Sequence, residues 1–166
     1  MSRRAIIVHG KPSQEKYETS PTDPSDSHWI PWAKHQFNLA GIQTFAPDMP
    51  KPYAPDYETW EEELARYNPE KPNTSFVGLS AGASFLLRYL SEAQNIFPDR
   101  LVLVAPWLDL KGKYGEFSKF EIDPELTERC LGSLTVFYSS LDDEQAQAGL
   151  AVVRTSLPDA RYLDMP

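Results

Sequence analysis

The chain has 166 residues, the length of one domain with a sizeable core. Lysine and arginine together number 16 against 24 aspartate and glutamate residues, so the net charge is −8. This acidic excess disfavours a nucleic-acid partner or an anionic membrane surface, and it would not attract an anionic substrate. A single cysteine, Cys130, excludes an intrachain disulfide, and no apolar run approaches the roughly 20 residues of a membrane span. These features predict a cytoplasmic protein that does not bind membranes.

Strands and helices are predicted to alternate along the chain. In order, the apolar patterns predict a strand at 5–8, a helix at 29–40, a strand at 42–46, a helix at 56–67, a strand at 74–78, a helix at 81–93, strands at 101–105 and 134–138, a helix at 145–157 and a strand at 160–163. Residues 11–27 are predicted to form a long loop, and residues 106–133 have a mixed pattern. This alternation predicts an α/β fold: a mostly parallel six-stranded sheet with helices on both faces. The continuous apolar run at 101–105 predicts a strand buried on both faces.

The most informative motif is Gly78-Leu79-Ser80-Ala81-Gly82, between a predicted strand and a predicted helix. A Gly-x-Ser-x-Gly sequence at such a turn is typical of a nucleophile elbow, which pushes the serine hydroxyl out above the sheet. Glycines fit on either side because a side chain there would collide with the neighbouring strand or helix. The backbone N–H of Ala81 can form half of an oxyanion hole. The alternative is a chance occurrence of the motif in a loop.

Two further segments follow predicted strands. His9-Gly10 ends the first strand, and the backbone N–H of Lys11 would supply the second oxyanion donor; the alternative is an ordinary turn that ends a strand. Asp142 and Asp143 follow the fifth strand, where a carboxylate can orient a catalytic histidine. The alternative is a solvated acidic turn that opens the next helix, and both interpretations can hold because there are two aspartates.

In combination, these segments resemble the small serine hydrolases of the YdeN and retinoblastoma-binding-protein-nine type, within the α/β-hydrolase superfamily. The matching segments cover residues 6–13, 28–32, 47–50, 77–83, 102–109, 120–124 and 137–139. The resemblance implies one minimal α/β-hydrolase domain over residues 1–166, with Ser80 as nucleophile and Asp142 as the triad acid, or Asp143 if the loop is shifted. It also implies cleavage of small-molecule esters or amides with no metal or organic cofactor.

The sequence departs from the family pattern at two places. Leu79 stands where the family usually has a histidine before the nucleophile. The family also continues after its last strand into a Gly-His-Phe-like segment with the catalytic histidine and a final helix, whereas this sequence stops at Asp164-Met165-Pro166. We therefore expect a chain truncated before that segment, whose 166-residue form is poorly active or inactive. The alternative is a pseudo-hydrolase, a non-catalytic protein- or ligand-binding module.

The remaining candidates are histidines and aromatic residues. Among the three histidines, His9 is predicted to bind substrate beside Ser80, His28 to pack at the rim of the oxyanion loop and His35 to lie at the surface. Trp107 is predicted to bind substrate as well. It belongs to a group of aromatic residues that could line an acyl pocket above the serine or pack in the core: Trp107, Tyr114, Phe117 and Phe120. The sequence predicts no oligomeric state.

Overall fold

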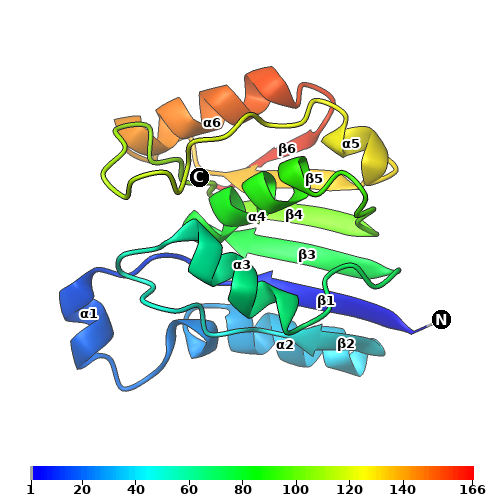
Figure 1. The fold of residues 1–166 in the computed structure, drawn as a ribbon, viewed down its shortest axis with the longest axis horizontal. Helices are drawn as coiled ribbons and strands as arrows, with labels where there is room; N and C mark the ends of the chain where they lie inside the picture. Colours follow the sequence, from blue (N-terminus) through cyan, green and yellow to red (C-terminus); the bar gives the residue numbers. More distant parts are fainter. Residues whose placement is uncertain (1) are drawn as a thin grey trace.

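The computed structural model of the protein describes residues 2–166 and contains one six-stranded parallel sheet (Figure 1). The strands are β1 (Arg3–Val8), β2 (Ile42–Phe45), β3 (Thr74–Leu79), β4 (Arg100–Val104), β5 (Leu134–Tyr138) and β6 (Arg161–Asp164). The helices are α1 (Gln14–Thr19), η1 (Pro24–Asp26), α2 (Ile30–Leu39), α3 (Tyr57–Ala65), α4 (Ala81–Glu92), α5 (Leu126–Arg129) and α6 (Glu144–Ser156). The predicted fold class is confirmed, and every strand pair is parallel.

The strand order β2-β1-β3-β4-β5-β6 places a topological switch point between β1 and β3. The chain leaves β1 toward β2 on one side and returns to β3 on the other. In open α/β sheets, ligands bind beyond the carboxyl ends of the strands at such a point. In the β1–β3 register Val8 lies opposite Gly78, so the segments that begin at His9 and Ser80 emerge side by side.

The two faces of the sheet are covered unequally (Figure 1). The larger core lies on one face, where α3, α4, α5 and α6 pack against the sheet. Its centre is a set of fully buried rings: Trp60 meets Phe85 and Phe117 edge to face, at centroid distances of 5.5 and 5.3 Å. Such aromatic pairs contribute about 0.5–1.5 kcal/mol each beyond their area. On the opposite face, α2 places Ile30 and Ala33 against the middle of the sheet.

The prediction that residues 101–105 are buried on both faces is wrong for one face. In β4, Leu101 and Leu103 face the larger core and are fully buried, whereas Val102 and Val104 on the opposite face are half-buried. The physical reason is that α2 lies mainly over β2 and β1 on that face, so the cluster that includes Ile30 and Ala33 covers Val102 only in part. Within this range, no helix follows β6.

The segment predicted as a loop at 11–27 contains two short helices, α1 and η1. Ser13 caps α1 by accepting the Lys16 N–H at 3.2 Å on its hydroxyl oxygen. No residue of α1 is buried, so the helix has no apolar face that sequence periodicity could reveal.

None of the helices in residues 2–166 is both long and apolar enough to cross a membrane. The cytoplasmic location stays a prediction.

Candidate active site

Ser80 adopts the strained backbone conformation that a nucleophile elbow requires. It lies between β3 and α4 with φ 55° and ψ −114°, a region that L residues rarely adopt. Its N–H donates to the Val104 carbonyl at 2.8 Å and its carbonyl accepts the N–H of Trp107 at 3.2 Å, so the end of β4 holds the turn. Strain of this kind costs about 1–3 kcal/mol and persists only where the surroundings fix it.

The glycines on either side of Ser80 allow α4 to lie against two strands. A Cβ atom on Gly82 would lie 2.3 Å from the Val8 carbonyl oxygen and 2.4 Å from that of His9. A Cβ atom on Gly78 would lie 2.6 Å from the Cα of Ala83. All of these neighbours are backbone atoms that cannot rotate away. The predicted steric reason for the two glycines is therefore visible in the packing.

We expect Gly82→Ala to lower the free energy of unfolding by about 3 kcal/mol or more, because α4 must move away from β1. Gly149→Ala is a matched control inside α6. A Cβ atom there would meet its nearest neighbours at 3.4–3.6 Å, and alanine favours a helix over glycine by up to about 1 kcal/mol. Urea unfolding of the two variants measures both values. Equal stability of the two variants would contradict the close approach of α4 to β1.

Two backbone N–H groups near Ser80 are free to bind an anion. Among residues 2–166, the N–H groups of Lys11 and Ala81 donate to no protein acceptor. Ala81 begins α4, where the helix dipole favours negative charge. The Lys11 loop lies close to the elbow, since a Cβ atom on Gly10 would lie 3.1 Å from the Cβ of Ser80. The structure therefore brings together the residues predicted to form an oxyanion hole.

His9 lies in the core, with only 1% of its surface exposed. Its Nε2 atom accepts the N–H of Met49 at 2.9 Å, so the proton of the neutral ring is on Nδ1, which donates to the Gly10 carbonyl at 2.8 Å. Burial lowers the pKa of His9 below its ordinary value of 6.5. The prediction that His9 binds substrate is not supported by this position. Its contacts instead fit a residue that holds the loop carrying Lys11.

Because the pKa of His9 is lower in the folded chain than in the unfolded chain, protons bind preferentially to the unfolded chain. Its stabilising contribution is present above pH 6.5 and is lost as the pH falls toward the folded pKa. We expect the free energy of unfolding to fall as the pH drops below about 6.5, with this one group contributing up to about 1.4 kcal/mol per pH unit. His9→Gln should flatten the profile relative to that of the wild type. Equal slopes for His9→Gln and the wild type in urea unfolding would contradict this assignment.

The two acidic candidates have different surroundings. Asp143 caps α6 by accepting the Ala146 N–H at 2.9 Å. Asp142 caps no helix, and it lines a small hollow beyond β4 and β5 together with Ala105 and Ser139. Ala105, which lines this hollow, directly follows Val104, and the Val104 carbonyl accepts the Ser80 N–H. These positions favour Asp142 over Asp143 as the triad acid.

The aromatic residues after β4 belong to the larger core or pack against it, and none lines the cavity beside Ser80: Trp107, Tyr114, Phe117 and Phe120. Phe117 is 1% exposed and packs on Trp60, as the core interpretation expects. Trp107 and Tyr114 are half-buried, and their rings meet edge to face at 5.8 Å. Trp107 is not among the residues that line the cavity beside Ser80. Trp107 contacts the elbow through its backbone N–H, which donates to the Ser80 carbonyl.

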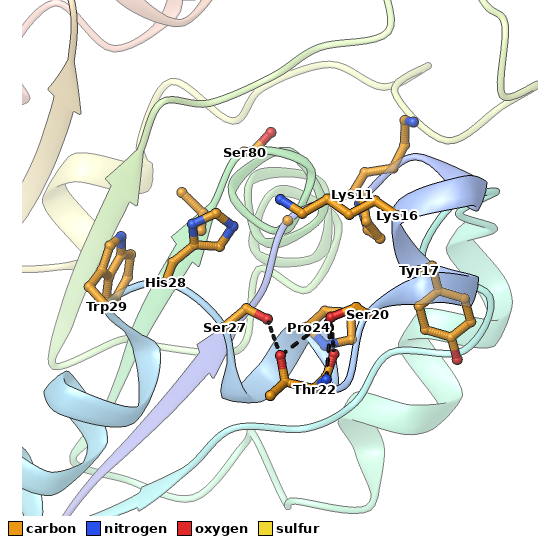
Figure 2. A pocket seen from close by; sticks show the side chains of 13 residues that line it. Lys11, Lys16, Tyr17, Ser20, Thr22, Pro24, Ser27, His28, Trp29 and Ser80 are labelled. Carbon is orange, nitrogen blue, oxygen red and sulfur yellow. Dashed lines mark hydrogen bonds between the residues drawn. The ribbon is translucent and has the colours of Figure 1, made fainter.

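A cavity of about 280 Å³ opens beside Ser80, between the Lys11 loop and the segment with α1 and η1 (Figure 2). It is lined by Gly10, Lys11, Pro12, Lys16, Tyr17, Ser20, Thr22, Pro24, Ser27, His28, Trp29, Leu79 and Ser80. His28 lines it as an exposed residue with φ 59°, which agrees with the predicted rim position. Sequence reasoning missed the wall formed by residues 16–27, whose only signals were the length and polarity of the predicted loop. In residues 2–166, no group of three or more His, Cys, Asp or Glu side chains could hold a metal ion.

Comparisons with known proteins identify the fold of this chain. No protein-family model and no curated protein matches the sequence. Among solved structures, the ydeN gene product from B. subtilis has 23% identity and a TM-score of 0.76, over 99% of this chain and 86% of that one. Est1E from Butyrivibrio proteoclasticus, solved with ferulic acid, has 14% identity and a TM-score of 0.66, over 99% of this chain and 79% of that one. MGS-MChE2 is an α/β hydrolase from the metagenome of sediments from the lagoon of Mar Chica, Morocco. It has 13% identity and a TM-score of 0.58, over 100% of this chain and 82% of that one. The chain therefore has the α/β-hydrolase fold, and the predicted resemblance to the YdeN type is confirmed at the level of that fold.

Proposed function

We propose that the protein is a serine hydrolase that cleaves ester or amide bonds of small molecules, with Ser80 as the nucleophile. The observation that carries this proposal is the strained elbow conformation of Ser80 at the mouth of a cavity. The unpartnered N–H groups of Lys11 and Ala81 support it, because an acyl-transfer site needs donors for the oxyanion.

In the proposed reaction, the Ser80 oxygen bonds to the substrate carbonyl carbon and its proton passes to a histidine. The negative charge on the carbonyl oxygen is stabilised by the N–H groups of Lys11 and Ala81. Collapse of this intermediate breaks the bond to the alcohol or amine, which takes the proton from the histidine. Water then attacks the acyl-serine with the same base, releasing the acid and restoring the Ser80 hydroxyl. Asp142 orients the histidine and stabilises its charged form.

We propose that the histidine of this mechanism is not one of the three in residues 2–166. Within that range, no histidine ring is hydrogen-bonded to Ser80 or Asp142, and both nitrogens of His9 are bonded to backbone groups. We propose that the base belongs to a segment following β6, as the family resemblance implies. The same observation favours the second candidate, a ligand-binding pseudo-hydrolase, if the gene encodes no such histidine.

Turnover of 4-nitrophenyl butyrate tests the proposal on two forms, the 166-residue chain and the chain continued to the end of its gene. The continued form should hydrolyse the ester, and Ser80→Ala should lower kcat by about 10³- to 10⁶-fold because the nucleophile is lost. The 166-residue form should retain only the slow rate that binding and oxyanion stabilisation supply. No turnover by a folded continued form would leave the binding module as the better interpretation.

A further inference from the structure

The residues that line the cavity beside Ser80 differ in charge from the chain as a whole. The lining includes two lysines, Lys11 and Lys16, and His28, but no aspartate or glutamate (Figure 2). The chain as a whole has 24 acidic and 16 basic residues. At physiological salt, charges more than about 8 Å apart are largely screened, so a bound molecule responds most to the charges in and directly around the cavity. In the sequence, the acidic residue Asp23 stands between the lining residues Thr22 and Pro24.

The two lysine ammonium groups are not neutralised by carboxylates. Within residues 2–166, neither Lys11 nor Lys16 has a carboxylate oxygen within the distance of an ion pair. The Lys11 ammonium instead lies 4.7 Å from the centroid of the Tyr114 ring and lowers the pKa of that phenol. The Lys16 ammonium is therefore available to an anion that enters the cavity, whereas the Lys11 ammonium lies over Tyr114, which does not line the cavity.

Hydroxyl groups from the α1–η1 segment add neutral donors to the same cavity. The hydroxyls of Ser20 and Ser27 donate to the carbonyls of Thr22 and Asp23, at 2.9 and 3.0 Å. The Thr22 hydroxyl lies 3.4 Å from each of these two serine oxygens, and its own proton is committed to no carbonyl (Figure 2). This proton can turn toward an oxygen atom of a ligand.

The rest of the lining is apolar, including Tyr17, Trp29 and Leu79. A volume of about 280 Å³ is at the small end for ligand pockets, which suits a short apolar group bearing one polar head. A carboxylate or phosphate in the cavity would contact Lys16 and the Thr22 hydroxyl, and the apolar part of the ligand would contact the rings.

We propose that this cavity binds an anionic oxygen group, a carboxylate or a phosphate, on a short apolar part of the substrate. Ser80 would then act faster on anionic esters or amides than on neutral ones. This conclusion about substrate rests on the proposed function, but anion binding itself does not need the nucleophile. The expectation from net charge alone, that an anion would not be attracted, is reversed at the site.

The test is a ¹H–¹⁵N NMR titration of the 166-residue protein with phenylacetate, phenyl phosphate and the neutral phenylacetamide. Phenylacetate or phenyl phosphate should shift the Trp29 indole N–H signal and bind at least about tenfold more tightly than phenylacetamide in about 20 mM salt, with the difference shrinking in about 500 mM salt. The tighter of the two anions identifies the preferred head group. Equal binding of the anions and the amide would overturn the proposal.

The double variant K11M/K16M should weaken binding of the anion about tenfold and leave phenylacetamide binding unchanged, because it removes charge but keeps the Lys11 N–H. The control K34M/K71M removes the same charge from exposed lysines outside the cavity and should bind like the wild type. Equal weakening in the two double variants would overturn the proposal, since only the net charge would then matter. If K11M/K16M does not fold, K16M alone, at an exposed position, serves in its place.

Ser80→Ala separates this proposal from the proposed function. The variant should bind the anion as the wild type does, whatever its activity. Anion binding by a protein with no hydrolase activity would support the anion site and overturn the proposed function. Hydrolase activity without a preference for anions would support the proposed function and overturn the anion site.

Discussion

Replacing Asp142 by asparagine should lower kcat by about 10⁴-fold in a form of the protein that carries the histidine proposed to follow β6. The reason is that asparagine cannot hold the histidine in the correct tautomer or stabilise its charged form. The adjacent change Asp143→Asn is the matched control. Asp143 accepts the Ala146 N–H as the cap of α6, and asparagine caps a helix as well as aspartate does, so this variant should keep both activity and stability.

Steady-state kinetics measure the activity of the two variants, and urea unfolding measures their stability. If Asp143→Asn loses the activity and Asp142→Asn keeps it, the assignment of the acid is reversed. Loss of activity accompanied by unfolding in either variant would show as a change in the unfolding midpoint, which separates stability from chemistry.

Replacing Arg129 by methionine should lower the free energy of unfolding by about 3–5 kcal/mol, because it leaves a buried carboxylate unpaired. The Arg129 side chain is 9% exposed and lies 2.9 Å from the Asp123 carboxylate, itself 8% exposed. The guanidinium also donates to the carbonyls of Leu90, Ala93 and Ile96 at and beyond the end of α4. The single change therefore removes an ion pair and the partners of three carbonyls.

Arg66→Met is the control for this prediction. Its ion pair with Glu63 lies at the surface, where the Arg66 side chain is 75% exposed, and such pairs contribute about 0–1 kcal/mol. Urea unfolding should separate the two variants clearly. A loss below about 1 kcal/mol for Arg129→Met would mean that Asp123 and the carbonyls find other partners.

The regular elements could be predicted from the sequence because their apolar residues are patterned by the core. The strand predicted at 134–138 has those bounds in the structure, and the helix predicted at 81–93 differs by one residue from α4. The turn at Ser80 was also predictable, since Gly78 and Gly82 are required by backbone contacts that any such turn makes.

The remaining features depend on contacts between distant segments, which no local pattern encodes. The hydrogen bond from Met49 to His9 joins residues 40 positions apart and decides that this histidine is held in the core. The helix α1 buries no side chain, so the wall that it gives the cavity left no periodic signal. The half-buried face of β4 reflects which helices cover the sheet, which the apolar composition of the strand does not specify.

The central claim is that Ser80 is an activated nucleophile, and labelling with a fluorophosphonate probe tests it most directly. The 166-residue chain and the chain continued to the end of its gene would each be treated, and any adduct mapped by mass spectrometry. Because we propose that the base follows β6, we predict an adduct on Ser80 in the continued form and little or none in the 166-residue form. A folded continued form that carries no adduct on Ser80 would contradict the claim.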